Sequence, residues 1–312
     1  MEITQKMNKN RLRKLLLRII RSWQLYILIA PATLYYAIFH FQPIYGVQIA
    51  FRNYKAKLGI TGSPWVGLAH FERFIEGPNF LRLLENTLSI SLTNLIFGFP
   101  LPILLALTLN ELRQPRYKRL VQTVSYAPHF ISTVVMVSII QIFLDYETGI
   151  INHLISLFGV GPFNFLAKGN WFHAIYVISG IWKNMGWKSI VFLSALSSID
   201  PSHTEAAMVD GATRLQRIWH VNLPTILPTV VIMFILSAGD VMSVGYEKAY
   251  LLQNSLNLEY SEIISTYVYK VGLINTQFSF SAAVGLFNSI CNVILLLSVN
   301  WISKKVSEVG LF

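Results

Sequence analysis

Long apolar runs without charge constrain this chain more than any other feature. A helix needs about 20 apolar residues to cross the hydrocarbon core of a bilayer. Five uncharged runs meet this length, at residues 22–51, 86–110, 120–144, 218–239 and 271–303. A sixth block, residues 171–199, is apolar except for Lys183 and Lys188. Only 13% of the 312 residues are charged, about half the usual share in a soluble domain, which argues against a soluble protein.

The six blocks predict an all-α, polytopic membrane protein with six transmembrane helices. We place the helices near residues 23–42, 86–110, 121–144, 172–197, 224–244 and 281–302. The first block is not a secretory signal, because its apolar run continues to Phe41, beyond the length of a signal peptide's apolar core.

Basic residues between the blocks predict the orientation, because cytoplasmic loops carry an excess of Lys and Arg. Fifteen fall on one side of the predicted membrane and eight on the other. The fifteen are Lys6, Lys9, Arg11, Arg13, Lys14, Arg18, Arg21, Arg113, Arg116, Lys118, Arg119, Arg214, Arg217, Lys304 and Lys305. We therefore expect both termini in the cytoplasm, with a basic tail over 1–22, a transmembrane domain over 23–302 and a second tail over 303–312.

One predicted external segment, residues 245–280, contains a short amphipathic helix over 261–272. Its apolar side chains fall on one helical face. They are Ile263, Ile264, Tyr267, Val268 and Val271. We expect this helix to lie at the membrane surface or against a partner.

The predicted cytoplasmic loop over residues 198–224 has the pattern of two short helices joined by a hinge. Asp200 is a suitable N-cap and Pro201 suits the first helical position. Gly211 permits a sharp turn. Pro224 lacks an N–H, which costs nothing in the first turn of the next helix.

This loop resembles the Glu-Ala-Ala ("EAA") loop of permeases from binding-protein-dependent ABC importers. The matching residues are Glu205, Ala206, Ala207, Gly211, Leu223 and Pro224, whereas Val221 replaces the isoleucine of the pattern. The resemblance implies the type I importer permease fold of the MalF/MalG kind, with a core over about 82–302. It also implies that the loop is a coupling helix that inserts into the ATP-hydrolysing subunit, where Glu205 pairs with a basic group.

The resemblance extends along nearly the whole chain to the LplB/YteP-like branch of carbohydrate-uptake permeases. The residues that carry it include Phe41, Pro43, Tyr45 and Gly46, Trp65 to Leu68, Gly186 and Trp187, Ile199 to Pro201, and Val244 to Lys248. Such proteins lie in the bacterial cytoplasmic (inner) membrane and import oligosaccharides, often fragments of pectin, rhamnogalacturonan or alginate. The implied partners are a second homologous permease, two copies of an ATPase subunit and an external solute-binding protein.

ATP must be hydrolysed by another chain, because the sequence has no G-x-x-x-x-G-K-[ST] phosphate loop. We therefore expect no catalytic residues, no metal site and no cofactor in this chain, with ATP and Mg²⁺ on the partner ATPase. A membrane enzyme would need clustered Asp, Glu or His, whereas the 15 acidic residues here are scattered. A secondary transporter and an ABC permease for a solute other than sugar are the alternatives.

Polar residues inside the predicted spans are candidates for the translocation path, because such groups face the bundle interior or a wet cavity. They are Asn94, Lys183, Asn184, Lys188, Asp240, Asn288 and Asn292. The alternative role of the amides is hydrogen bonding between helices. Five residues turn a helix through about 140°, so we expect that Lys183 and Lys188 do not both face one lumen. At least one of them is expected to favour an acidic oligosaccharide.

Overall fold

The computed structural model describes residues 21–112, 114–307 and 309–311. Most of these residues are helical, and the only extended pairings among them are two isolated β-bridges. The chain divides into two compact units, Met1–Gly67 and Leu68–Phe312, which are described one at a time. Arg113 and most of the predicted basic tail lie outside the described residues.

The first unit consists of one long apolar helix followed by a small loop. Its elements are α2 (Trp23–Tyr36), η1 (Ala37–Phe41), α3 (Gln42–Ile44), η2 (Tyr45–Phe51) and α4 (Gly59–Gly62). The first four run on as a single apolar helix, Trp23–Phe51, so the first predicted span continues beyond residue 42. The loop after it is closed by Arg52, whose Nη1 donates to the carbonyl oxygens of Thr61 (3.0 Å) and Ser63 (2.9 Å).

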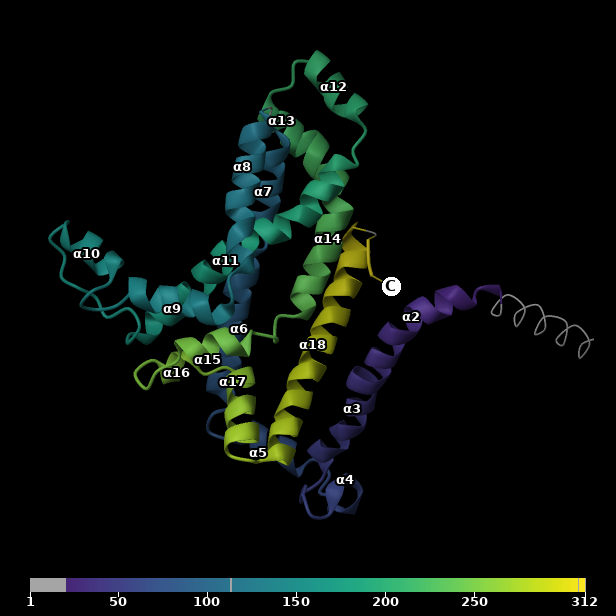
Figure 1. The fold of residues 1–312 in the computed structure, drawn as a ribbon, viewed down its shortest axis with the longest axis vertical. Helices are drawn as coiled ribbons and strands as arrows, with labels where there is room; N and C mark the ends of the chain where they lie inside the picture. The colour runs from purple at the N-terminus through teal and green to yellow at the C-terminus, as the bar shows by residue number, and fades with distance from the viewer. Residues whose placement is uncertain (1–20, 113, 308, 312) are drawn as a thin grey trace, which may run out of the picture. The chain divides into compact units, whose positions relative to one another are not determined.

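The second unit holds the remaining elements (Figure 1). They are α5 (Ala69–Ile75), α6 (Phe80–Gly98), α7 (Pro100–Asn110), α8 (Pro115–Tyr126), η3 (Ala127–Phe130), α9 (Thr133–Phe143), α10 (Ile150–Ser156), α11 (Gly169–Ser197), α12 (Pro201–Val209), α13 (Arg214–Arg217), η4 (Ile218–Asn222), α14 (Leu223–Gly239), α15 (Tyr246–Leu252), α16 (Leu258–Ser261), α17 (Ile264–Tyr269), η5 (Lys270–Ile274) and α18 (Phe278–Ser307).

Within the described residues of both units, four helices are long and apolar enough to cross a membrane. They are Trp23–Phe51, Phe80–Asn110, Arg214–Gly239 and Phe278–Ser307. Three of them lie in the second unit and contain α6 with α7, α14, and α18. The fourth predicted span corresponds to α11, which has 29 residues but carries Lys183 and Lys188 and is not among these four. The count of six spans therefore stays a prediction.

The span predicted over 121–144 is not a single helix. The chain here forms two helices, Pro115–Phe130 and Thr133–Phe143, that are bent by 100°. The break lies at Ile131 and Ser132, which both have extended backbone. Ser132 begins the second helix because its hydroxyl accepts the backbone N–H of Val135 at 3.3 Å. If its two helices are counted as one span, this bent pair is a fifth candidate span.

The core of the second unit joins α7, α11 and α14. Ile103, Ala106 and Leu107 of α7 pack against Phe192 and Leu196 of α11 and Ile226 of α14. All six side chains are at most 8% exposed. Between helices in a bilayer, such close packing stabilises the unit through van der Waals contacts, so this core joins α7 to α11 and α14.

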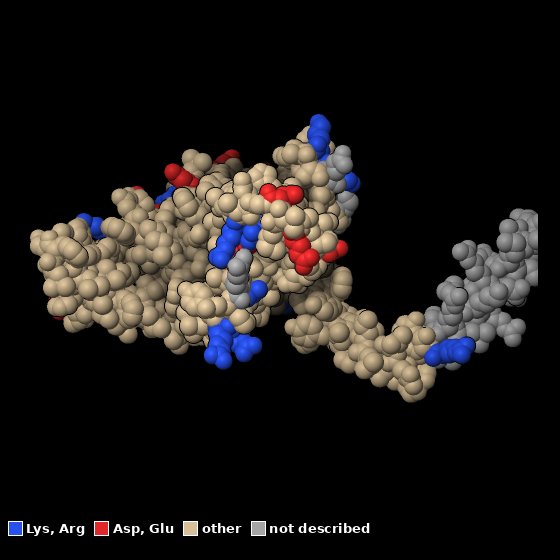
Figure 2. Space-filling model, turned by 90° about the horizontal axis from the view of Figure 1, so that it is seen from above, with Lys and Arg blue, Asp and Glu red and all other residues tan. Residues whose placement is uncertain are grey.

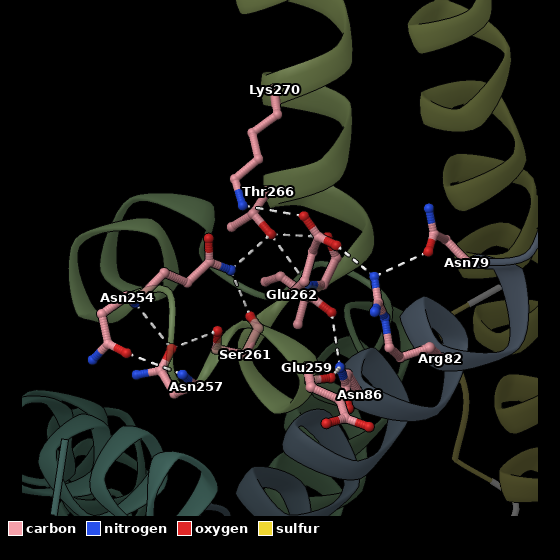
Figure 3. A network of polar contacts seen from close by, with 12 residues as sticks. Asn79, Arg82, Asn86, Asn254, Asn257, Glu259, Ser261, Glu262, Thr266 and Lys270 are labelled. Atoms are coloured by element: carbon pink, nitrogen blue, oxygen red, sulfur yellow. Dashed lines mark hydrogen bonds and ion pairs between the residues drawn. The ribbon is translucent and has the colours of Figure 1, made fainter. Parts of the chain in front are cut away.

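The expectation that the helix over residues 261–272 lies at the membrane surface or against a partner is wrong. The apolar face of α17 and η5 packs inside the unit, where Ile264 and Val271 join a core with Phe74, Phe280 and Val284. Hydrogen bonds hold the same segment to α6 (Figure 3). The amide of Asn86 donates to the carbonyl oxygens of Glu259 (2.8 Å) and Glu262 (3.0 Å). The apolar face that the sequence revealed is thus covered by the chain itself.

Glu262 is the centre of this network. Its carboxylate receives Arg82 Nη2 at 2.9 Å and Lys270 Nζ at 3.1 Å, and its side chain is only 9% exposed. Figure 3 shows the carboxylate between the two cations, which come from α6 and from the start of η5. The carboxylate therefore neutralises two basic side chains that would otherwise repel each other.

We expect Glu262→Gln to lower the thermal unfolding midpoint of the detergent-solubilised protein. Removing the charge leaves Arg82 and Lys270 uncompensated, a loss of about 2 kcal/mol once the 39% exposure of the Arg82 side chain is considered. Glu85→Gln, at an exposed position of α6, is the matched control and should change little. Equal midpoints for the two variants would contradict this role of Glu262.

Candidate coupling segment and translocation cavity

Helices α12 and α13 form the helix–turn–helix that the sequence predicts for residues 198–224. Figure 1 shows them at one end of the second unit, with α12 beyond the ends of α7, α8 and α14. Asp200 caps α12 as expected, because its carboxylate accepts the backbone N–H of Ser202 at 2.9 Å. The same hydrogen bond lowers the pKa of Asp200 below its usual value. The cap therefore stays charged at neutral pH.

Gly211 is the hinge between the two helices. Its φ of +78° lies in the left-handed region, and nothing would crowd a Cβ there. The backbone conformation alone therefore favours glycine at this position. Beyond the turn, Thr213 begins α13 with a capping box, in which Gln216 Oε1 accepts the backbone N–H of Thr213 at 2.8 Å. The caps at Asp200 and Thr213 define where α12 and α13 begin. We call residues 200–222, which contain both helices and the hinge, the coupling arm.

The residues that match the EAA pattern lie on two sides of this arm. Glu205 is exposed and lines a cleft of about 280 Å³ with Asn110, Leu196 and Asn222. Ala207 lines a second cleft, of about 290 Å³, with Gly211 and other residues of the hinge. Ala206 lies between Glu205 and Ala207 on α12, whereas Leu223 and Pro224 form the first turn of α14. The structure thus gathers the first four on the arm and places the last two where it joins α14.

The surface of the arm combines charge with exposed apolar side chains. Met208, Val209, Leu215 and Trp219 are 44%, 88%, 65% and 56% exposed. Figure 2 looks onto the end of the molecule where α12 lies in Figure 1, and shows acidic and basic side chains exposed on that face. Apolar side chains beside charges are typical of a surface that docks another protein.

Sequence reasoning missed the acid that holds this arm. Glu111 follows the last residue of α7, and its carboxylate receives Arg217 Nη2 at 2.6 Å and Asn222 Nδ2 at 3.1 Å. The side chains of Glu111 and Arg217 are 12% and 9% exposed. A lone acid directly after the uncharged run 86–110, in an otherwise basic loop, was the signal available in the sequence.

Two cavities in the second unit hold most of the polar residues predicted for the translocation path. The smaller, of about 270 Å³, is lined by residues that include Asn94, Tyr176, Lys188 and Asp240. The larger, of about 350 Å³, is lined by residues that include Asn94, His129, Lys183, Asn184, Lys188 and Lys248. Five of the seven predicted residues therefore face these cavities.

The other two predicted residues, Asn288 and Asn292, line neither cavity. Asn292 instead forms hydrogen bonds with the segment that follows α14. Its Oδ1 accepts the backbone N–H of Met242 at 2.9 Å, and its Nδ2 donates to Ser243 Oγ at 2.7 Å. This is the alternative role that the sequence left open for the amides, a hydrogen bond between segments of the bundle.

The expectation that Lys183 and Lys188 do not share a lumen is wrong, because both line the larger cavity. The 140° between their backbone positions is offset by their long side chains, which carry the ammonium group far from the helix axis. Lys248 of α15, which sequence reasoning missed, lines the same cavity. Its Nζ donates to the carbonyl oxygen of Tyr176 and lies 4.2 Å from the centroid of that ring.

The larger cavity therefore has a strongly basic lining. Among the described residues that line it, three are lysines and none is an aspartate or glutamate. Aromatic groups lie close by, since His129 stacks on Trp187 with ring centroids 4.5 Å apart. His129 Nδ1 also donates to Asn184 Oδ1 at 3.2 Å. Positive charge, amides and aromatic faces together suit a ligand with carboxylates and hydroxyls.

Comparison with known proteins supports the same interpretation. Residues 98–308 match the family described as binding-protein-dependent transport system inner membrane component. The chain is 44% identical over 304 residues to the polygalacturonan/rhamnogalacturonan transport system permease protein YteP of Bacillus subtilis (strain 168), covering 97% of this chain and 95% of that protein. It is also 44% identical to protein LplB of the same organism, covering 94% and 92%.

A solved structure has the same fold. A chain in the crystal structure of a bacterial ABC transporter involved in the import of the acidic polysaccharide alginate superposes with a TM-score of 0.86 at 38% identity, covering 94% of this chain and 99% of that one. A second structure shows an alginate transporter in complex with its alginate pentasaccharide-bound periplasmic protein, with a TM-score of 0.86 at 37% identity. This chain therefore belongs to the family of inner membrane components of binding-protein-dependent transport systems, and it is an all-α permease subunit of an ABC importer rather than an enzyme.

Proposed function

We propose that this chain forms half of the translocation pore of an ATP-driven importer for acidic oligosaccharides, such as fragments of pectin, rhamnogalacturonan or alginate. The observation that carries the proposal is the convergence of Lys183, Lys188 and Lys248 on one cavity. Lys248 is 8% exposed and Lys183 is partly buried, and none of the described residues that line this cavity is a carboxylate. Ammonium groups withdrawn from water without a carboxylate are costly. An anionic ligand that passes through the cavity would relieve that cost, and a neutral sugar would not.

The names of the relatives agree with this substrate class. YteP is named for polygalacturonan and rhamnogalacturonan, and the structural neighbour is described as an importer of the acidic polysaccharide alginate. Both substrates are polymers that contain uronate sugars. The acidic character of the ligand is thus supported twice, by the charge in the cavity and by the chemistry of the relatives' substrates.

We propose further that the EAA-like arm docks on the ATPase at the cytoplasmic face, with both chain ends on that side. Three features support this role. The arm extends beyond the ends of α7 and α14, it has a glycine hinge, and it exposes apolar side chains beside Glu205. The complete importer then contains this chain, a second homologous permease, two ATPase subunits that bind ATP and Mg²⁺, and an external solute-binding protein.

The cavity proposal is tested with the whole importer in proteoliposomes. Uptake of a uronate oligomer at sub-saturating concentration should fall about tenfold in each of the single variants Lys183→Gln and Lys188→Gln. Each lost charge removes roughly 1.4 kcal/mol of attraction in a partly buried site. Lys168→Gln, at an exposed position outside both cavities, is the matched control.

Uptake of a neutral oligosaccharide serves as the second readout. Should the uronate oligomer enter at the normal rate through both variants, the proposal that these lysines attract an acidic substrate is wrong. An equal loss for neutral and acidic oligomers would likewise contradict it, because it would reveal a defect in the pore rather than lost attraction.

The docking role of the arm is tested with Glu205→Lys. Membrane insertion should be unchanged, because Glu205 is exposed, whereas co-purification with the ATPase and uptake should be lost through repulsion from the basic group expected there. Glu147→Lys, the same change at an exposed position of the loop before α10, should behave like the wild type. Normal ATPase recovery and uptake in Glu205→Lys would rule out a coupling role for this residue.

A further inference from the structure

Glu111 has an unusual position for an acid. It is the C-cap of α7, where the partial negative charge of the helix end disfavours a carboxylate, and it is nearly buried. Two donors offset this penalty. Arg217 Nη2 lies 2.6 Å from Oε2 and Asn222 Nδ2 lies 3.1 Å from Oε1. Both oxygens of a buried carboxylate are thus used to hold residues from one distant segment.

The two donors belong to different parts of the coupling arm. Arg217 ends α13, and its Nη1 also donates to the carbonyl oxygen of Ala212 at 3.2 Å, directly after the hinge. Asn222 ends η4 at the entrance to α14 and is 1% exposed. Through Glu111 the end of α7 is therefore tied to the hinge, to α13 and to the start of α14.

The other end of this connection reaches the cavity. Helices α6 and α7 form one continuous span, Phe80–Asn110, and Asn94, Gly98 and Pro102 of this span line the smaller cavity. Pro102 lies nine residues before Glu111, about 14 Å along a helix. Helix α7 also shares a buried core with α11 that includes Leu107 and Leu196, and Tyr176 and Lys188 of α11 line the same cavity. The end of α7 is thus connected to two walls of the cavity.

We propose that Glu111 is a positioning residue for energy coupling, which transmits movement between the coupling arm and the span that lines the translocation cavity. This inference rests on the proposed docking of the arm on the ATPase. Arg217 and Asn222 are its two contacts on the arm. Without Glu111 the arm still docks, but its direct link to α7 is lost, so less of its movement reaches the cavity wall formed by α6 and α7.

The test uses the assembled importer in proteoliposomes and the double variant Glu111→Gln/Arg217→Gln. The double change avoids leaving one buried charge without a partner, which would itself destabilise the protein. We expect normal recovery of the ATPase with the complex and normal basal ATP hydrolysis. The stimulation of hydrolysis by the substrate-loaded binding protein should fall about tenfold, as expected for the loss of a charged hydrogen bond.

A second variant covers the case in which the double variant does not assemble. Asn222→Leu removes only the bond to Glu111 Oε1, so stimulation should fall roughly fivefold. Glu76→Gln changes another glutamate at a helix C-cap, that of α5, and should leave stimulation unchanged. Wild-type stimulation in either the double variant or Asn222→Leu would overturn the inference.

The same assay separates this inference from the proposed function. If Glu205→Lys abolishes stimulation while the Glu111 and Asn222 variants keep it, the arm docks but Glu111 is not its link to the cavity. If Glu205→Lys also keeps full stimulation and ATPase recovery, the docking role itself is wrong. Loss of stimulation with retained ATPase recovery in the Glu111 variants supports the link.

Discussion

The structure depends on one constraint of the bilayer, that backbone polar groups must be bonded within the protein. Apolar helices such as Phe80–Asn110 and Phe278–Ser307 satisfy it by their own hydrogen bonds. Departures from regular helix therefore need a local reason. At the 100° bend the hydroxyl of Ser132 bonds a backbone N–H that the helix leaves free. At Gly211 the turn lies in the exposed coupling arm, outside the long apolar helices.

The same constraint separates the polar groups of the second unit into two kinds. Asn86, Asn292 and Glu262 bond neighbouring segments and hold the bundle together. Asn94, Lys183 and Lys188 instead line cavities. The first kind stabilises the fold, and the second gives the cavities their polar and charged lining. Glu111 belongs with the first kind by its burial, yet its partners lie on the arm that we propose to dock on the ATPase.

Much of the helical architecture could be predicted from the sequence, because long apolar runs have few alternatives in a membrane. Local signals were also sufficient for the arm, where the Asp200 cap and the Gly211 hinge lie as expected. Features that depend on distant contacts were not predictable. The apolar face around Ile264 looked like a surface helix, because the sequence does not reveal that Phe74 and Val284 cover it. Lys248 and Glu111 were missed for the same reason, since their partners lie in other helices.

The most direct test of the account is a cross-linking measurement between the arm and the ATPase. In a Cys291→Ser background, a single cysteine is placed at Val209, which is 88% exposed on α12, or at Phe158, which is 84% exposed in the loop after α10. The importer is then labelled with benzophenone-4-maleimide, which bonds to the cysteine, and is illuminated in the absence and presence of ATP so that the benzophenone inserts into a C–H bond of a neighbouring chain. Docking of the arm on the ATPase predicts cross-links from Val209→Cys, with a yield that changes on ATP binding, and none from Phe158→Cys. Cross-links from Phe158→Cys and none from Val209→Cys would contradict it.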